Sequence, residues 1–167
     1  MGEFKFQADA KLVNSLLRRV PNQKLEYRHG CILGEVKLPL GAVNAVVIPS
    51  FSGSHVVLAI PFKEIKGDIT GKFFLSKLIS AFWGTISKQV EKAAFPVLQK
   101  YGMGRDSLVI EKVKDSGGDV GKIKISVSAI NRWLEAQHPR LSPNLTDLTF
   151  SIEGVEVKGN LRAIAAA

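Results

Sequence analysis

A pattern that runs from a strand into a helix occurs twice in this chain, over residues 2–17 and again over residues 121–134. In each copy a glycine opens a stretch with apolar side chains at every second position, the period of a half-buried strand. Each stretch leads into a short helical segment with the pattern apolar-Asn-x-x-Leu. Two such units predict a fold with related halves, and we expect a weak internal strand–helix–strand repeat over residues 2–38 and 121–163.

The two copies align with a gap between the strand and the helix. Before the gap, Phe4, Phe6 and Ala8 stand against Ile123, Ile125 and Val127, and after it Asn14 stands against Asn131. None of these side chains is chemically reactive in a way that suggests catalysis. The repeat therefore predicts shape rather than a reaction.

The composition describes an ordinary globular chain without a covalent staple. Its 167 residues are 46% hydrophobic and 23% charged, which is enough apolar material for a real core. The single cysteine, Cys31, cannot form an internal disulfide, and every apolar run is far shorter than the ~18–20 residues of a transmembrane helix. A net charge of +8 favours anionic surfaces, either lipid headgroups or nucleic acid. Many of the cations alternate with apolar residues, however, as they do on solvated strand faces.

The start of the sequence, Met-Gly-Glu-Phe-Lys-Phe, lacks the charged-then-apolar plan of a secretory signal. Two locations are therefore expected, depending on processing. The protein is cytoplasmic if the chain is complete, and periplasmic or membrane-associated if a leader has been removed.

One long helix is predicted over residues 72–100. Its apolar residues follow one another by three or four positions, and a second set widens this stripe beyond the usual third of the helix surface. The first set is Leu75, Leu78, Phe82, Ile86, Val90, Ala93 and Val97, and the second is Ile79, Trp83, Ala94 and Leu98. Pro96 is expected to end or kink this helix.

The remaining segments are predicted to be strands. Residues 22–62 form short alternating or β-branched runs separated by turns. Residues 108–113 return as a strand, and residues 145–161 form a closing hairpin that echoes residues 24–38. We therefore predict an α+β fold: a strongly curved antiparallel sheet of about 7–9 strands wrapped around one long helix, plus two short helices.

Patterns for catalysis, metals and nucleotides are weak throughout. Residues 67–73 resemble a phosphate-binding loop, but one residue is missing between the glycines, and Phe73 replaces the Ser or Thr that holds magnesium. His29 and Cys31 share one face of a predicted strand, yet no third ligand or orienting residue is near them in sequence. A buried thiol beside a surface imidazole explains that pair. We predict no enzymatic activity, no metal and no cofactor.

The repeated pattern, the long helix and the closing hairpin together resemble the tubular lipid-binding (TULIP-like) superfamily, which includes the bactericidal/permeability-increasing proteins. They look most like its small bacterial, single-unit members, and residues 4–14 and 123–131 look like the strand-to-helix entry of those domains. The resemblance implies a long helix lying in a strongly curved antiparallel sheet, with lipid acyl chains held between them. This chain differs from the secreted members in lacking a signal and a disulfide.

Our first functional hypothesis is a non-catalytic binder of lipid or another long apolar ligand, in a groove between the long helix and the sheet. The predicted lining comes from all three helices: Leu75, Leu78, Phe82, Trp83, Ile86, Val90, Leu16, Leu17 and Trp133. Binding is expected to follow apolar burial, at about 25 cal/mol per Å². The positive charge favours an anionic membrane surface as a further partner.

The main alternative is a protein–protein interaction module or a homodimer that uses the apolar helix stripe and holds no small ligand. Simple filling of a core by the same side chains is as well supported as a ligand surface. Nucleic-acid binding rests on net charge alone and is disfavoured, because the aromatic residues fall on apolar faces rather than among cations.

Overall fold

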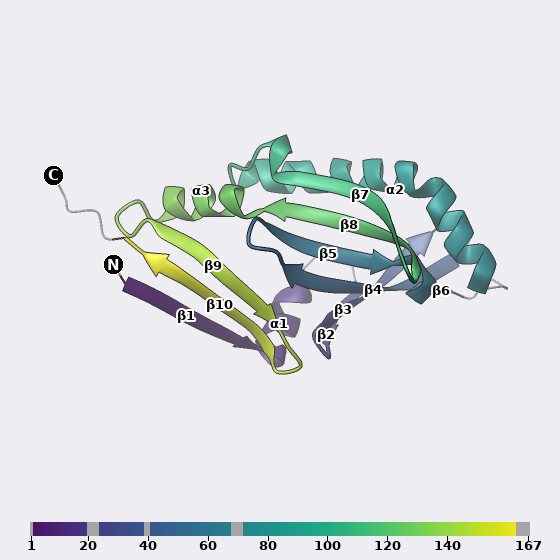
Figure 1. Cartoon of the computed structure of the whole chain (residues 1–167), viewed down its shortest axis with the longest axis horizontal. Coiled ribbons are helices and arrows are strands. Elements are labelled where there is room, and N and C mark those ends of the chain that lie inside the picture. The colour runs from purple at the N-terminus through teal and green to yellow at the C-terminus, as the bar shows by residue number, and fades with distance from the viewer. Residues whose placement is uncertain (1, 20–23, 39–40, 68–71, 163–167) are drawn as a thin grey trace.

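The computed structural model describes residues 2–19, 24–38, 41–67 and 72–162, whose arrangement is shown in Figure 1. Within these residues there are three α-helices: α1 (Ala10–Leu17), α2 (Lys72–Lys100) and α3 (Val127–Gln137). Two short 3-10 helices, η1 (Phe62–Glu64) and η2 (Arg105–Ser107), precede and follow α2. The strands are β1 (Gly2–Asp9), β2 (Lys24–Arg28), β3 (Cys31–Leu38), β4 (Gly41–Phe51), β5 (His55–Pro61), β6 (Lys66–Gly67), β7 (Leu108–Asp115), β8 (Gly118–Ser126), β9 (Pro143–Phe150) and β10 (Gly154–Leu161).

The described strands form two antiparallel sheets. The larger has seven strands in the order β2-β3-β4-β5-β8-β7, with β6 beside β4, and the smaller has three in the order β1-β10-β9. The α+β class, the antiparallel pairing and the one long helix with two short ones are confirmed. The prediction of a single sheet is wrong. The sheets are separate because β10 pairs with β1 on one side and with β9 on the other, and neither sheet closes among the described residues.

The long helix continues through the proline at which an end or a kink was expected. Pro96 lies inside α2, which continues to Lys100. Gly102 then takes the left-handed conformation (φ 73°) and donates its N–H to the Gln99 carbonyl (3.0 Å). A glycine in this conformation ends a helix at little steric cost, so Gly102 rather than Pro96 supplies the stop.

Two clusters of buried side chains hold the layers together. One lies between α2, η1 and the larger sheet and contains Val43, Phe62, Ile65, Leu75, Ile79 and Trp83. The other contains Val56, Val127 and Leu145 and joins β5, α3 and β9. In the first cluster the Trp83 ring packs against Phe62 (5.2 Å between ring centroids) and covers Gly121 of β8.

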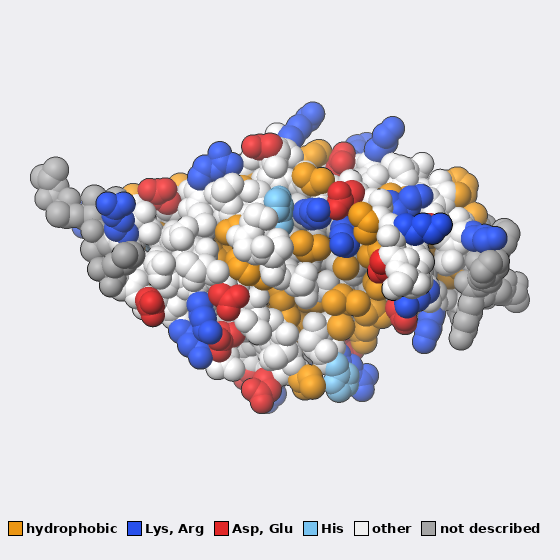
Figure 2. All heavy atoms as spheres, viewed as in Figure 1, with side chains coloured by type: hydrophobic (Ala, Val, Ile, Leu, Met, Phe, Trp, Pro, Cys, Tyr) orange, Lys and Arg blue, Asp and Glu red, His pale blue; other side chains and the backbone are white. Residues whose placement is uncertain are grey.

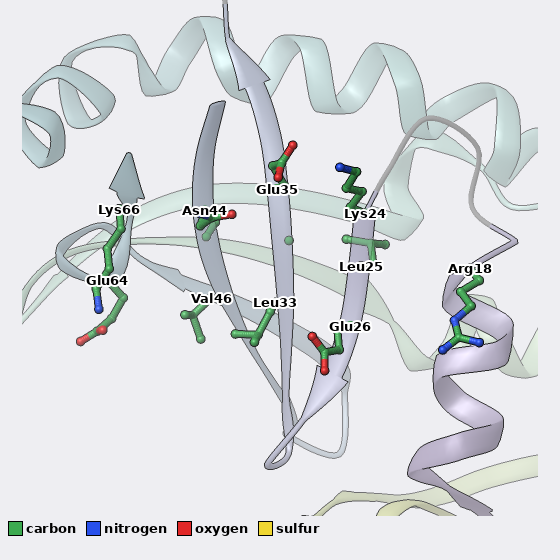
Figure 3. Close-up of a pocket in the computed structure, with 12 residues that line it drawn as sticks. Arg18, Lys24, Leu25, Glu26, Leu33, Glu35, Asn44, Val46, Glu64 and Lys66 are labelled. Carbon is green, nitrogen blue, oxygen red and sulfur yellow. The ribbon is translucent and has the colours of Figure 1, made fainter. Parts of the chain in front are cut away.

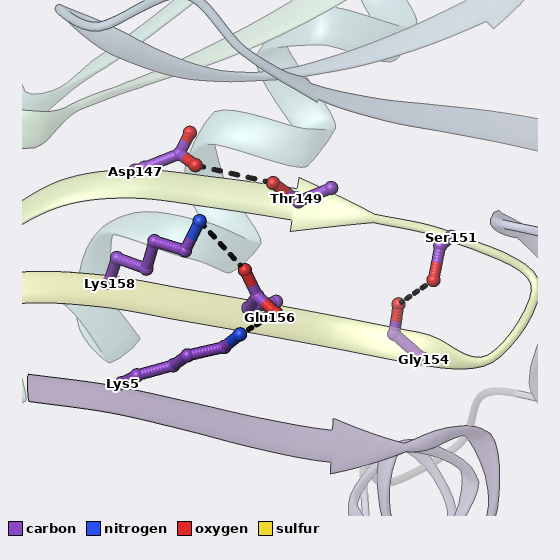
Figure 4. A network of polar contacts seen from close by, with 7 residues as sticks. All are labelled: Lys5, Asp147, Thr149, Ser151, Gly154, Glu156 and Lys158. Atoms are coloured by element: carbon purple, nitrogen blue, oxygen red, sulfur yellow. Dashed lines mark hydrogen bonds and ion pairs between the residues drawn. The ribbon is translucent and has the colours of Figure 1, made fainter.

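The smaller sheet has one apolar face and one polar face, as alternation along its strands requires. The apolar face carries Phe4, Phe6, Ala8, Val155, Val157, Leu161, Leu148 and Leu145. On the polar face, Glu156 accepts ion pairs from Lys5 (2.9 Å) and Lys158 (3.0 Å), as Figure 4 shows. Hydrogen bonds from these two ammonium groups lower the pKa of the Glu156 carboxyl. All three side chains meet solvent, so the network fixes the polar face outward more than it stabilises the fold.

The strand–helix pairs β1–α1 and β8–α3 make the same contacts. Each residue of the first pair corresponds to the residue 117 positions later in the second pair. At the first helical residue, the Ala10 amide donates to the Glu153 carbonyl, and the Val127 amide donates to the Ser54 carbonyl, both at 2.9 Å. Each helix is also capped in the same way, because the side chain before it accepts a hydrogen bond from the third helical amide. The capping pairs are Asp9–Leu12 (2.8 Å) and Ser126–Ala129 (3.4 Å).

The asparagine of each unit binds the strand that follows its helix. Asn14 accepts from the Tyr27 amide through Oδ1 (2.6 Å), and Asn131 accepts in the same way from the Leu145 amide (2.8 Å). The contacts relate residues 9–14 to residues 126–131 without a gap, and therefore pair Phe6 with Ile123. The two-residue gap of the sequence alignment is absent from the structure.

The hairpin β4–β5, which pairs with β8, corresponds to the hairpin β9–β10, which pairs with β1. Equivalent residues of the two hairpins are 99 positions apart. In β4–β5 the Ser52 amide and hydroxyl both donate to the His55 carbonyl (3.0 and 3.2 Å). In β9–β10 the Ser151 amide and hydroxyl both donate to the Gly154 carbonyl (2.9 and 3.2 Å). By its turn contacts and pairing the closing hairpin thus matches β4–β5, and by the asparagine contact β9 also corresponds to β2, the first strand of the predicted echo at residues 24–38. We call β9, β10, β1 and α1 the first unit, and β4, β5, β8 and α3 the second unit.

Tyr27 connects the larger sheet to the smaller one. Its side chain is buried, and its hydroxyl donates to the Ser151 carbonyl (2.6 Å) and lies 3.0 Å from the Gly154 carbonyl. Both carbonyls belong to the β9–β10 turn, so this phenol holds the turn against β2. Burial is the main cause that raises the pKa of the Tyr27 hydroxyl.

Tyr27→Phe is expected to lower the free energy of unfolding by about 1–2 kcal/mol, because it removes a buried donor from two carbonyls. Because this pKa is raised, the contribution of the neutral Tyr27 hydroxyl to the free energy of unfolding is fully present below the ordinary phenol pKa of about 10. It is lost as the pH rises through the raised value. The variant should therefore lose less stability than the parent above that pH. Urea unfolding at neutral and alkaline pH measures both effects, with exposed Tyr101→Phe as the control. Equal losses for the two variants would contradict the prediction.

Candidate functional site

The predicted ligand-lining residues of α2 divide between core and surface. Leu75 and Trp83 are buried in the first cluster, and Ile86 packs against it. Leu78 and Val90 are partly buried, and Phe82 is 55% exposed. Leu75 and Trp83 thus act as core side chains in this structure, and Phe82 is the most accessible of the six.

The predicted residues on the short helices lie in two other groups. Leu16 is 51% exposed on α1, beside the partly buried Leu17. Trp133 of α3 meets Tyr101 edge-to-face, with 5.7 Å between ring centroids, and its Nε1 is buried without a hydrogen-bond partner. The structure therefore places the helix residues in separate groups. Whether any of them contacts a ligand stays a prediction.

An apolar pocket opens at a place that the sequence did not indicate, between the end of α3 and the apolar face of the smaller sheet. Its volume is about 290 Å³. The lining side chains come from β1, α3, the loop after it, β9 and β10: Phe4, Leu134, His138, Leu141, Pro143, Leu145, Val157 and Leu161. His138 is the one side chain in this lining that can ionise, so the pocket suits an apolar ligand.

Backbone geometry shapes this pocket. Phe4 lies directly opposite Gly159 across the β1–β10 ladder. A Cβ at Gly159 would be 2.3 Å from the Phe4 ring, so the glycine lets the ring lie flat along the neighbouring strand. The loop after α3 is tied to the sheet, because the Arg162 amide donates to the Leu141 carbonyl (2.9 Å). The signal in the sequence was the alternation of Phe4 and Phe6, which predicts an apolar sheet face but not what covers it.

A larger groove crosses β2, β3 and β4 near the end of α1 (Figure 3). Its volume is about 660 Å³. Three cationic and three carboxylate side chains line it, namely Arg18, Lys24 and Lys66, with Glu26, Glu35 and Glu64. Leu33 and Val46 lie between them. Because the lining charges balance, this groove has no preference for an ion of one sign, and Leu25 and Ala45 add to its apolar lining.

The outward face of the larger sheet also exposes apolar side chains. Trp83 covers Gly121 from one side of the sheet, and Lys124, three positions along β8, lies on the other. On that second face Ile48 and Val109 are exposed, and Lys124 pairs with Glu111 (2.6 Å). Figure 2 shows apolar side chains interrupted by lysines and carboxylates on the face in view. Scattered apolar residues among charges are normal for a protein surface.

The positions considered for chemistry are not assembled into a reactive site among the described residues. No group of three or more His, Cys, Asp or Glu side chains there could hold a metal ion. His29 takes a positive φ (53°) with Gly30 in the β2–β3 turn, and Cys31 is a partly buried free thiol. Most of the loop over residues 67–73 lies outside the described side chains.

No helix in the described part of the chain is long and apolar enough to cross a membrane. No family model, curated protein or solved structure matches the chain. The resemblance to the TULIP-like superfamily therefore stays a prediction.

Proposed function

We propose that this protein binds an apolar ligand without catalysis, and that the ligand enters the pocket between α3 and the smaller sheet. The observation that carries the proposal is the lining itself, in which residues from five segments present apolar side chains to one open space. A cavity of about 290 Å³ is near the lower end of ligand pockets. It accommodates a segment of an acyl chain, and each buried methylene contributes about 0.8 kcal/mol before ordering costs.

The groove implied by the TULIP-like resemblance, between α2 and a strongly curved sheet, is the second place proposed for the same ligand. It rests on Phe82, which is exposed, and on Ile86 and Val90, which are partly buried. The alternative function, a partner or homodimer surface on α2, is supported by the exposure of both Phe82 and Val97. The positive charge of the chain supports an anionic membrane surface as the source of a lipid ligand.

Leu141→Asp is expected to weaken binding of a fluorescent long-chain fatty acid at least about tenfold, because it places a carboxylate in the apolar lining. Leu141 is 47% exposed, so the substitution should leave the fold intact. The matched control is Ile152→Asp, an even more exposed aliphatic residue outside the lining. Fluorescence titration of the three proteins measures the affinities.

Equal binding by parent, Leu141→Asp and Ile152→Asp would refute the α3 pocket. Loss of binding in Phe82→Asp, with retention in Leu141→Asp, would move the ligand to the α2 groove. A dimer in light scattering that Phe82→Asp dissociates, with no fatty-acid binding by any variant, would support the interaction module instead.

A further inference from the structure

The two units differ because another segment of the chain covers the strand edge and helix face of the second unit. There β7 pairs with the outer edge of β8, and the residues that lead into β7 pack on α3. Tyr101 meets Trp133 edge-to-face, and Met103 lies with Ala129 around the same small cavity. Ala129 is only 3% exposed. One continuous stretch, residues 101–115, thus covers both a strand edge and a helix face.

Among the described residues, no segment covers the corresponding surface of the first unit. Leu12, the counterpart of Ala129, is 41% exposed, and Leu16, the counterpart of Trp133, is 51% exposed. β1 is the outer strand of its sheet, and no strand in the described part of the chain pairs with its free edge (Figure 1). Phe6 on this strand is exposed as well. We call the free edge of β1, with Phe6, Leu12 and Leu16, the β1–α1 surface.

We propose that the β1–α1 surface binds an extended segment of a partner protein, which adds a strand to β1 as β7 does to β8. The N–H and C=O groups on a free strand edge need hydrogen-bonding partners, which another strand supplies and a lipid tail does not. The residues before that strand lie on α1 and cover Leu12 and Leu16, as residues 101–106 cover α3. This site is separate from the apolar pocket and does not depend on a ligand in it.

The second unit indicates the chemistry of the partner segment. Glu111 of β7 lies directly opposite Lys122 of β8, and Lys5 of β1 is the counterpart of Lys122. Lys5 already pairs with Glu156, and a carboxylate opposite it on the partner strand adds a second exposed ion pair, as Glu111 makes with Lys124 on β8. Tyr101 stands seven residues before β7 begins at Leu108. The segment therefore carries an aromatic or large aliphatic residue, then an extended stretch with alternating apolar residues and an acidic residue opposite Lys5.

A second copy of this chain fits the edge less well. The segment of a copy that has the required form, residues 101–115, is already paired with β8 and packed on α3. A heterologous segment is therefore favoured over self-association.

A labelled peptide with the sequence of residues 101–115 serves as the probe, titrated into the full chain and followed by fluorescence anisotropy. Saturable binding is expected. Leu16→Asp should weaken peptide binding at least about tenfold, because a carboxylate replaces the apolar surface on which Tyr101 of the peptide packs. Ile152→Asp, an exposed aliphatic position in the β9–β10 turn, is the matched control and should bind like the parent.

A charge exchange tests the register. Lys5→Glu should weaken binding about tenfold, and a peptide carrying Glu111→Lys should restore it, which a general loss of folding would not do. Absence of saturable binding would overturn the proposal. Binding that neither Leu16→Asp nor Lys5→Glu changes would also overturn it, because the peptide would then be replacing β7 at β8. A dimer in light scattering that Leu16→Asp dissociates would replace the partner segment by a second copy.

Discussion

Gly121→Ala is expected to lower the free energy of unfolding by about 3 kcal/mol, the upper end of the usual cost of overpacking a core. Gly121 lies in the middle of β8, where β5 and β7 pair with it on both sides. A Cβ there would be 2.3 to 2.8 Å from three atoms of the Trp83 ring. The ring is itself buried against Phe62, so it cannot move aside without opening the first core cluster. Urea unfolding measures the loss.

Gly84→Ala is the matched control, because Gly84 follows Trp83 on α2 and a Cβ there would meet nothing within 4 Å. Within a helix this change should stabilise the protein by about 0.5–1 kcal/mol. Combining Gly121→Ala with Trp83→Leu should cost less stability than the sum of the two single changes, since a smaller side chain leaves room for the added methyl group. Equal stabilities of the two alanine variants would show that Trp83 does not pack on β8.

The long helix could be predicted from the sequence because its signal is local. Apolar residues recur along residues 72–100 at helical spacing, and the structure has α2 over the same residues. Which of those residues remain free for a ligand depends on the sheet opposite. Trp83 fits against the sheet because Gly121, distant in sequence, has no side chain. Periodicity gives no information about that contact, so Trp83 could be predicted as apolar but not assigned to core or lining.

The two sheets could not be predicted because their pairing is not local. β1 pairs with β10 from the other end of the chain, and the alternation within each strand is the same whichever strand it joins. The similarity of the β4–β5 and β9–β10 hairpins did have a signal in the sequence. Phe51, Ser52 and Val56 match Phe150, Ser151 and Val155. Such a short match becomes meaningful only when the turn contacts of both hairpins are known.

The β1–α1 surface follows from one difference between the units. The two units share the asparagine and capping contacts, so their strand–helix surfaces correspond residue by residue. In the second unit the chain itself covers that surface with residues 101–115 and with the β9 side of the smaller sheet. The first unit lies at the edge of the molecule, so its equivalent surface is open to solvent. A partner segment is therefore expected on the first unit, whereas the apolar pocket is lined by residues of both units.

Gly154→Ala is expected to lower the free energy of unfolding by more than about 3 kcal/mol, with the damage centred on the first unit. Gly154 has a φ of 147°, which side-chain-bearing residues rarely adopt, and a Cβ there would be 2.0 Å from the Ala8 carbonyl oxygen. That oxygen cannot withdraw easily, because Gly154 lies opposite Asp9 in the β1–β10 ladder. Beyond this residue, the Ala10 amide is bonded to the Glu153 carbonyl. The strain would therefore pass directly to β1 and to the start of α1.

The matched control is His55→Ala, at the counterpart of Gly154 in the second unit. His55 already carries a side chain, and its carbonyl accepts the same turn hydrogen bonds from Ser52. This change should cost less than about 1 kcal/mol, as most substitutions away from a core do. Urea unfolding gives the two free energies, and hydrogen exchange locates the loss. Relative to the parent, Gly154→Ala is expected to speed exchange more in β1 than in β8, because the strain enters through Ala8. Equal increases in both strands would show that the two units unfold together. The smaller sheet would then be as stable as the larger one.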